Sequence, residues 1–290
     1  MGVRRPVVAG QFYPAGRSSC VEAIQECLKN GQAAEQSPQR IVGGIVPHAG
    51  WTFSGSLAAK VFAAVRNRRP EVDTFLLFGA AHSYVRGMPA VWAQGAWETP
   101  LGSAPIDEDL AAALIETGTA AMDQTPHRRE HSIEVQVPFV QHLFPQASIV
   151  PVVVPPDDSA LAVGRAAAAV IEKADKQVVC IASTDLTHYG PNYGFMPRGV
   201  GPEAIRWAHE VNDRQFIDAA VALDAKRLLE SSTTNYNACG GGAAAAAVVA
   251  VKELGTERGV VLGHTNSNEL MMQKMGTGGD DSVGYVGMVF

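Results

Sequence analysis

The chain has 290 residues, of which 47% are hydrophobic and 18% charged, and its formal net charge is −6. This composition is typical of a folded globular protein, and the acidic balance gives no indication of nucleic acid or anionic membranes as partners. The longest apolar stretch, 243–251, is shorter than the roughly 20 residues that span a bilayer. No signal-peptide pattern opens the chain and no composition shift divides it, so we expect a cytoplasmic protein with one domain over residues 1–290.

Short apolar runs alternate with helical stretches along the chain. The runs are continuous, which is typical of strands covered on both faces. The predicted strands are 41–46, 73–78, 148–154, 177–182, 259–262 and 283–290. The predicted helices are 17–30, 54–67, 107–117, 131–144, 158–174, 203–223 and 240–254, with Asp107 and Asp158 as N-caps and 31–39 as a polar loop. This alternation predicts a three-layer α/β/α fold with a central, mostly parallel or mixed sheet.

Three of the predicted strands are followed closely by a histidine. His48, His82 and His188 lie just beyond the first, second and fourth strands. Ligands bind at the carboxyl edge of open α/β sheets, so we expect the three imidazoles to gather there. A single histidine at such a place is more often a hydrogen-bonded structural residue, but the repetition favours a site.

Cys239 precedes the last predicted helix and is followed by three glycines, Gly240 to Gly242. A cysteine at a helix N-terminus gains thiolate character from the backbone dipoles, and thiolates and imidazoles are good ligands for iron, zinc or copper. Alternatively, Cys239 is a small buried residue and the glycines form an anion-binding nest. The four cysteines have irregular spacing and no Cys-x-x-Cys pair, which argues against a zinc finger or a disulfide-stapled fold. The other three are expected in the core.

A fifth candidate element surrounds Glu130, His131 and Glu134. Glu130 and Glu134 are four residues apart, so they share a helical face if the helix has already begun. The carboxylates here could orient a ligand histidine or act as general base. By itself the spacing identifies no metal site.

Three other histidines are considered as site residues. His264 follows the strand 259–262 and could reach the same edge of the sheet, whereas His142 and His209 lie in predicted helices and are expected to be surface or capping residues. We therefore assign none of these three to the site.

Several short motifs occur in the order found in Memo-like proteins, and the chain is identified on them as a member of that family. The motifs are Pro47-His48-Ala49-Gly50-Trp51 with Ser54-Gly55, Gly79-Ala80-Ala81-His82, Glu130-His131-Ser132-Ile133-Glu134, Ser183-Thr184-Asp185-Leu186-Thr187-His188 and Ala238-Cys239-Gly240. The opening Ala9-Gly10-Gln11-Phe12-Tyr13-Pro14 and the closing Ser282-Val283-Gly284-Tyr285 also fit. The resemblance covers essentially the whole chain. The chain departs from the family pattern at two places. Arg128 and Arg129 stand where relatives often carry acidic residues, and Gly241 and Gly242 stand where bulkier residues are common.

The resemblance implies a fold similar to that of the class III extradiol dioxygenases, which bind non-haem iron(II) through two histidines and a carboxylate. In Memo-like proteins a cysteine takes the third position. The implied metal ligands are His48, His82 and Cys239, with iron(II) as the first choice and copper or zinc as alternatives.

The resemblance also implies roles around the metal. Asp185 and His188 would lie beside it, with His188, positioned by Asp185, moving protons. His131 and Glu134 would line or brace the pocket. The function implied is a metal-dependent redox or oxygenase-like enzyme with an unknown small-molecule substrate.

Two other functions stay open at this stage. The pocket could be a binding module for an anionic or phosphorylated ligand, since eukaryotic relatives have been described as signalling effectors that bind phosphotyrosine peptides. Cys239 and His188 could form a metal-independent hydrolase. Bacterial and archaeal relatives are often grouped with a radical-SAM protein and an AMMECR1-domain protein, which suggests a functional link of that kind.

Overall fold

The structure is a computed structural model that describes residues 2–30, 38–83 and 87–290. The predicted loop 31–39 falls mostly outside these residues. Within them, nine strands form a mixed sheet in the order β10-β12-β2-β9-β3-β8-β4-β7, with β11 also paired to β12. The strands of this sheet are β2 (Gly43–Val46), β3 (Thr74–Gly79), β4 (Ala90–Val91), β7 (Ala121–Met122), β8 (Ser148–Val153), β9 (Val178–Ser183), β10 (His188–Tyr189), β11 (Val260–Asn266) and β12 (Ser282–Val289).

The centre of the sheet is parallel. β2, β9, β3 and β8 run side by side in one direction, whereas β12 and β4 pair antiparallel at the two flanks. These central strands are buried along nearly their whole length, which explains their continuous apolar sequences. Because parallel strands end at one edge, the segments that follow β2, β9 and β3 lie next to each other.

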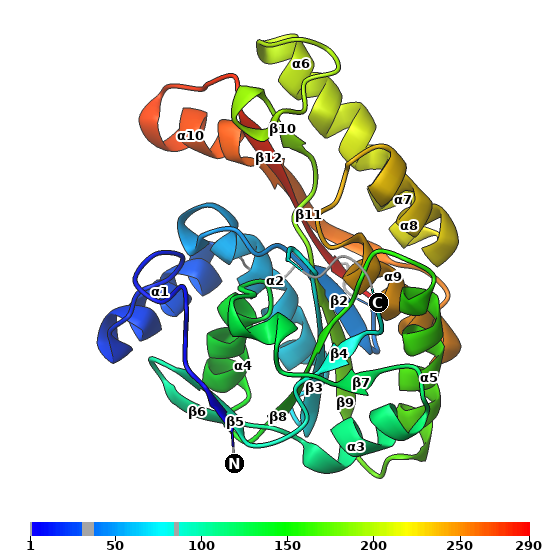
Figure 1. Ribbon diagram of the computed structural model, residues 1–290. Coiled ribbons are helices and arrows are strands. Elements are labelled where there is room, and N and C mark those ends of the chain that lie inside the picture. Colours follow the sequence, from blue (N-terminus) through cyan, green and yellow to red (C-terminus); the bar gives the residue numbers. More distant parts are fainter. Residues whose placement is uncertain (1, 31–37, 84–86) are drawn as a thin grey trace.

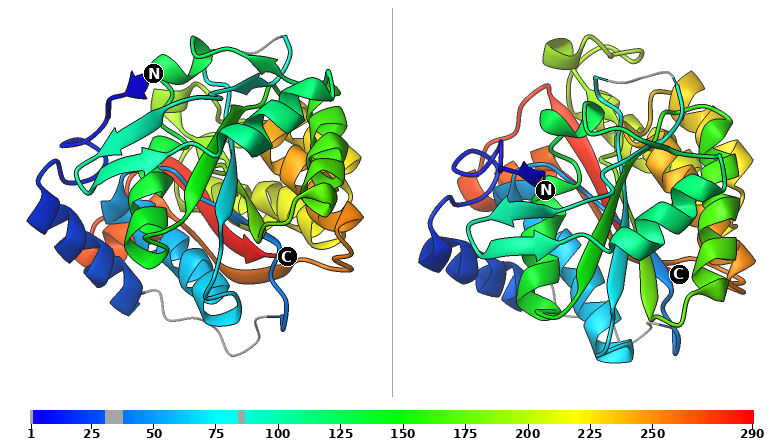
Figure 2. Two further views of the ribbon diagram at one scale, coloured as in Figure 1. Left: turned by 90° about the horizontal axis from the view of Figure 1, so that it is seen from below. Right: turned by 60° about the horizontal axis from the view of Figure 1, so that its bottom comes forward.

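Helices cover both faces of this sheet (Figure 1). One face carries α1 (Arg17–Asn30), α2 (Trp51–Arg68) and α4 (Val137–Leu143), and the other carries α3 (Glu108–Glu116), α5 (Ser159–Lys173), α8 (Ala225–Thr234) and α9 (Gly241–Glu253). The views in Figure 2 show the sheet between these two helical layers. The predicted three-layer α/β/α fold with a mixed sheet is therefore confirmed.

Close packing of α9 explains its alanine-rich sequence. Every residue from Gly241 to Val251 is buried. On the neighbouring α5, a Cβ at Gly164 would lie 2.5 Å from the carbonyl oxygen of Ala246, so only glycine allows the two helices to approach this closely.

The six predicted strands and the main predicted helices exist, with boundaries shifted by a few residues. The helix predicted at 131–144 is the clearest correction. Residues Glu134–Gln136 form a 3-10 turn, and α4 begins only at Val137. Pro138 explains this, because proline lacks an N–H and is tolerated only in the first turn of an α-helix.

The helix predicted at 203–223 is interrupted. It consists of α6 (Pro202–Trp207), a π-helical turn (Ala208–Asn212) and α7 (Asp213–Val221). Of the two predicted caps, the Asp107 side chain accepts from Leu110 N, whereas Asp158 makes no side-chain cap bond and its neighbour Asp157 accepts from Ser159 N instead.

Several elements were not predicted. They are α8, α10 (Ser267–Met275), the short strands at the edges of the main sheet, and a separate sheet of order β1-β5-β6 built from Val3–Arg4, Ala96–Thr99 and Gly102–Pro105. No helix in the described residues is long and apolar enough to cross a membrane.

Candidate functional site

The carboxyl edge of the parallel strands brings together side chains that are far apart in the sequence. His48 follows β2, His82 follows β3, and Ser183 ends β9. The three histidines His48, His82 and His131 each offer a ligand atom within 4.8 Å of the others. The gathering predicted for His48 and His82 is therefore present. The group contains His131 in place of His188, which was predicted to join them.

A buried hydrogen-bond network fixes the ring of His48, which is only 2% exposed. Its Nδ1 lies 3.2 Å from Ser183 Oγ, which itself donates to the carbonyl of Ser132 at 2.7 Å. Since the hydroxyl has only one proton to donate, His48 Nδ1 must be the donor in the first bond. The network therefore assigns the proton to Nδ1 and leaves Nε2 with a free lone pair.

Glu130 orients His82 in the same way. His82 Nδ1 lies 3.0 Å from both carboxylate oxygens of Glu130, and Glu130 also accepts from the backbone N–H of His82 and of Ser132. A carboxylate on Nδ1 fixes the orientation of a metal-binding imidazole and makes Nε2 a better ligand.

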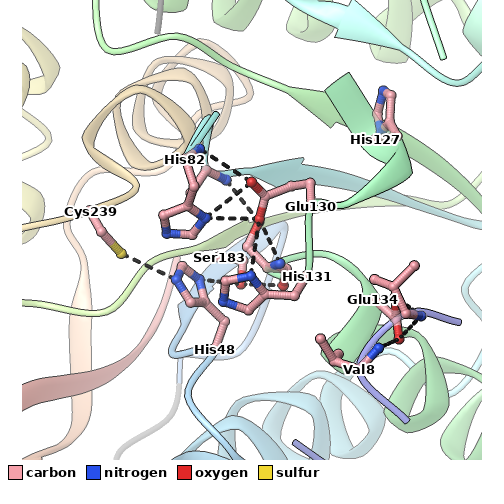
Figure 3. A network of polar contacts seen from close by, with 12 residues as sticks. Val8, His48, His82, His127, Glu130, His131, Glu134, Ser183 and Cys239 are labelled. Atoms are coloured by element: carbon pink, nitrogen blue, oxygen red, sulfur yellow. Dashed lines mark hydrogen bonds and ion pairs between the residues drawn. The ribbon is translucent and has the colours of Figure 1, made fainter. Parts of the chain in front are cut away.

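The thiol of Cys239 faces these imidazoles (Figure 3). Cys239 Sγ lies 3.2 Å from His48 Nε2. The ring of His131 stacks on that of His82 with centroids 4.8 Å apart, and it meets His48 edge to face at 5.3 Å. All four side chains point into one shared space, as Figure 3 shows.

Packing around the start of α9 holds Cys239 in place. The backbone N–H of Cys239 donates to the carbonyl of Asp185, and Gly240 N donates to Thr184 Oγ1. A Cβ at Gly242 would lie 2.2 Å from the carbonyl oxygen of Pro155. The glycines thus allow close packing of the helix start against the loops after β8 and β9, and the amide of Gly240 is already bonded within the protein.

The Asp185 side chain supports His48 rather than His188. Its Oδ1 accepts from the backbone N–H of His48 at 2.7 Å and of Ala49 at 3.3 Å. His188 Nδ1 lies 3.1 Å from the carbonyl of Leu186, so this carbonyl, and not Asp185, orients His188. The expected positioning of His188 by Asp185 is therefore corrected.

Glu134 points away from the histidines, as Figure 3 shows. Its carboxylate forms a buried ion pair with Arg4 at 2.7 Å and accepts hydrogen bonds from Val7 N, Val8 N and Tyr13 Oη. Glu130 and Glu134 do not share a helical face, because the chain is not helical between them. Glu134 braces the segment that carries His131 and does not line the site.

The charges of the site are strongly coupled. Burial lowers the pKa of His82, but hydrogen bonds to Cys239 and Glu130 outweigh it and raise this pKa to about 10. Burial opposes the ionisation of Glu130, but the bond with His82 lowers the pKa of Glu130 to about 2. Burial holds the pKa of His48 well below its usual value and raises that of Asp185 to about 7.

Two further expectations concern the other cysteines and the residues that orient the histidines. Cys20, Cys27 and Cys180 are buried core residues, as predicted. Ser183 and Glu130 orient the two histidines, and of these only Glu130 lay in a sequence motif that we had considered for this role.

The fold and the site together define a class of α/β protein with imidazoles and a thiol gathered at the carboxyl edge of a parallel sheet centre. The sequence comparison narrows this class. The family model described as Memo-like protein matches residues 4–289, so the chain belongs to the Memo-like family.

Curated relatives agree with this assignment. A MEMO1 family protein of Thermococcus onnurineus is 34% identical over 299 residues, covering 99% of each chain. One of Methanosarcina barkeri is 36% identical over 273 residues, covering 92% of this chain and 94% of the relative. One of Methanopyrus kandleri is 36% identical over 301 residues, covering 99% of this chain and 98% of the relative.

Among solved structures, an uncharacterized protein from Escherichia coli K12 is similar with a TM-score of 0.48 and 14% identity, covering 84% of this chain and 99% of that chain. At this level the similarity carries no argument about function.

Proposed function

We propose that the strand-end site binds a metal ion through His48 Nε2, His82 Nε2 and Cys239 Sγ, and that the protein is a metal-dependent redox or oxygenase-like enzyme acting on a small molecule. One observation carries the proposal. Both imidazoles have Nδ1 committed to an acceptor, Ser183 or Glu130, and the thiol of Cys239 lies 3.2 Å from Nε2 of His48. Metal binding would need neutral imidazoles and a deprotonated thiol, so it would release protons.

The donor set supports a transition metal. Two imidazoles and a thiolate suit iron(II), copper or zinc, whereas magnesium and calcium prefer oxygen ligands. Iron(II) is our first choice, with copper and zinc as alternatives. A bound iron(II) ion would supply redox chemistry and open coordination positions for a substrate.

The surrounding residues of the chain would handle the proton chemistry. Burial keeps the pKa of His188 below its usual value, so the ring is neutral at pH 7. Its Nδ1–H is donated to Leu186, which leaves Nε2 to accept a proton from a substrate. Asp185 would keep the backbone of His48 and Cys239 in register. His131, which stacks on His82, would line the open side of the site.

The second candidate is a metal-independent binding module for an anionic or phosphorylated ligand. The raised pKa of His82, about 10, favours it, because a cationic imidazole would attract an anion. A functional link to a radical-SAM protein and an AMMECR1-domain protein stays a prediction from the family resemblance.

Elemental analysis of protein purified anaerobically without chelator tests the proposal. We expect about one iron or copper per chain, lost in Cys239→Ala and in His48→Ala and retained in the control His142→Ala, which changes a half-buried histidine of α4. An iron or copper content that does not fall after either site substitution would refute the ligand set. Calorimetry with inorganic phosphate before and after metal removal separates the second candidate, which predicts the same binding in both forms.

A further inference from the structure

A second group of imidazole and carboxylate side chains lies outside the strand-end site. His209, Asp213 and His264 each offer one ligand atom, and these atoms lie within 4.8 Å of one another. His209 and Asp213 come from the helical stretch α6 to α7, whereas His264 comes from β11, which lies along it in Figure 1. We propose that this cluster binds a divalent transition-metal ion such as Zn²⁺, independently of the strand-end site.

Asp213 and His264 already have the spacing of two ligands of one ion. His264 Nε2 lies 3.1 Å from Asp213 Oδ2. Two ligands at about 2.0–2.1 Å from a tetrahedral ion are roughly 3.3 Å apart. The other carboxylate oxygen accepts from the backbone N–H of Thr187 at 3.0 Å, which directs Oδ2 toward the cluster. A bound ion would therefore replace the proton between His264 and Asp213 with little movement.

His209 has one ring nitrogen near a carboxylate and one without a partner. Its Nε2 lies 3.6 Å from Glu269 Oε1, an arrangement that orients metal-binding imidazoles. Its Nδ1 is buried and has no hydrogen-bond partner in the described residues. A buried polar atom without a partner costs free energy unless a ligand or water satisfies it, so this nitrogen points to an absent ligand.

The rings of His209 and His264 are stacked, with centroids 3.9 Å apart and planes 14° from parallel. Since the lone pairs lie in the ring planes, which are nearly parallel, the His209 ring must turn out of the stack before both rings can reach one ion. His209 is able to turn, because about 20% of its side chain is exposed and its outer side faces a pocket. Asp213, at 1% exposure, provides the fixed point of the site.

The backbone around the cluster is unusual in two ways. His209 lies in a π-helical turn, a feature that occurs frequently at functional sites. A Cβ at Gly284 on β12 would lie 2.1 Å from Asp213 Oδ2, so only glycine leaves room for the carboxylate. Both features place the Asp213 and His209 side chains against the same part of the sheet.

The charges near the cluster favour a cation. The adjoining pocket has a volume of about 680 Å³ and is lined by Glu210, Glu269 and Asp280 against one basic side chain, Arg206. Together with the buried Asp213, acidic groups exceed basic ones around the ion position. The pocket reaches the cluster at His209, which lines it.

Cobalt and zinc binding to the 290-residue chain tests this inference. In a His48→Ala/Cys239→Ala background we expect about one Zn²⁺ per chain by elemental analysis after dialysis, and none once His264→Ala is added. Co²⁺ should give visible d–d bands without a thiolate charge-transfer band, because the cluster contains no sulfur. His142→Ala serves as the control and should leave the stoichiometry unchanged.

The same experiment in the otherwise unchanged protein covers the case in which the background variant does not fold. In that protein, His264→Ala should lower the Zn²⁺ stoichiometry by one. In its Co²⁺-loaded form, any thiolate charge-transfer band from Cys239 should remain. If that band is absent but His264→Ala still removes one ion, this cluster is supported and the proposed function fails. Stoichiometry unchanged by His264→Ala would overturn the inference.

Discussion

The buried ion pair between Arg4 and Glu134 provides a sharp test of how the site is supported. The two side chains are 3% and 1% exposed and lie 2.7 Å apart. Glu134 also accepts hydrogen bonds from Val7 N, Val8 N and Tyr13 Oη. One carboxylate therefore links the N-terminal segment to the segment that carries His131. The substitution Glu134→Gln keeps the shape of the side chain and removes its charge.

Removing one partner of a buried pair leaves the other charge uncompensated, which costs about 3–5 kcal/mol of unfolding free energy. The Arg4 guanidinium would retain only neutral acceptors, which are the carbonyls of His127 and Glu130 and the amide oxygen of the introduced side chain, and its contact with the Trp97 ring. For 290 residues, with an unfolding entropy of about 2.1 cal/mol/K per residue, this loss corresponds to a fall in Tm of roughly 5–8 °C.

Equilibrium urea unfolding and thermal unfolding followed by circular dichroism would measure the loss. Arg5→Met is the matched control, because Arg5 is 88% exposed and lies 4.0 Å from Glu98, a surface pair that contributes at most about 1 kcal/mol. If Glu134→Gln cost no more than Arg5→Met, the reasoning that the buried carboxylate stabilises this segment would be wrong.

Two further predictions concern acid stability and packing. Burial lowers the pKa of His127 to about 4 from an ordinary value of 6.5, so the unfolded chain binds a proton between these values that the folded chain does not. The stability that neutral His127 contributes is complete above pH 6.5 and is lost as the pH falls through 4, by about 3 kcal/mol. His127→Gln keeps a donor for the Ala90 carbonyl and should flatten this part of the curve of unfolding free energy against pH; an unchanged curve would contradict the assignment. Gly242→Ala would bring a Cβ to 2.2 Å from the carbonyl oxygen of Pro155 and should cost about 1–3 kcal/mol in urea unfolding, whereas Gly279→Ala meets nothing closer than 4.0 Å and should be neutral; equal costs would rule out the packing argument.

The arrangement of His48 and His82 could be predicted because it follows from the main chain alone. Continuous apolar runs identify strands covered on both faces, such strands run parallel in the sheet centre, and parallel strands end at one edge. The position of a side chain just after a strand then follows without knowledge of any contact. The expectation for Cys239 as a ligand came instead from the family resemblance, because the residues alone left a small buried role for it open.

The fates of Glu130 and Glu134 could not be predicted from their spacing. Spacing of four residues brings side chains together only within a helix, and Pro138 delays the helix until Val137. The two carboxylates are drawn apart by partners distant in the sequence, His82 for one and Arg4 for the other. Likewise, the stacking of His209 on His264 could not be predicted, because His264 comes from a strand that lies 55 residues further along the chain.

A group of histidines can bind a metal ion only if the right ring nitrogen of each is free of a proton. Which nitrogen carries the proton is set by acceptors that are distant in the sequence. The acceptor for His48 Nδ1 lies on β9 and the acceptor for His82 Nδ1 lies before α4. Each acceptor removes one of two tautomers, so that Nε2 of both rings is left for the side where Cys239 lies. Replacing Ser183 or Glu130 would leave every proposed ligand in place and still alter which nitrogen is available. The position of the proposed ligands therefore follows from the topology, whereas the nitrogen that each ring offers follows from these two acceptors.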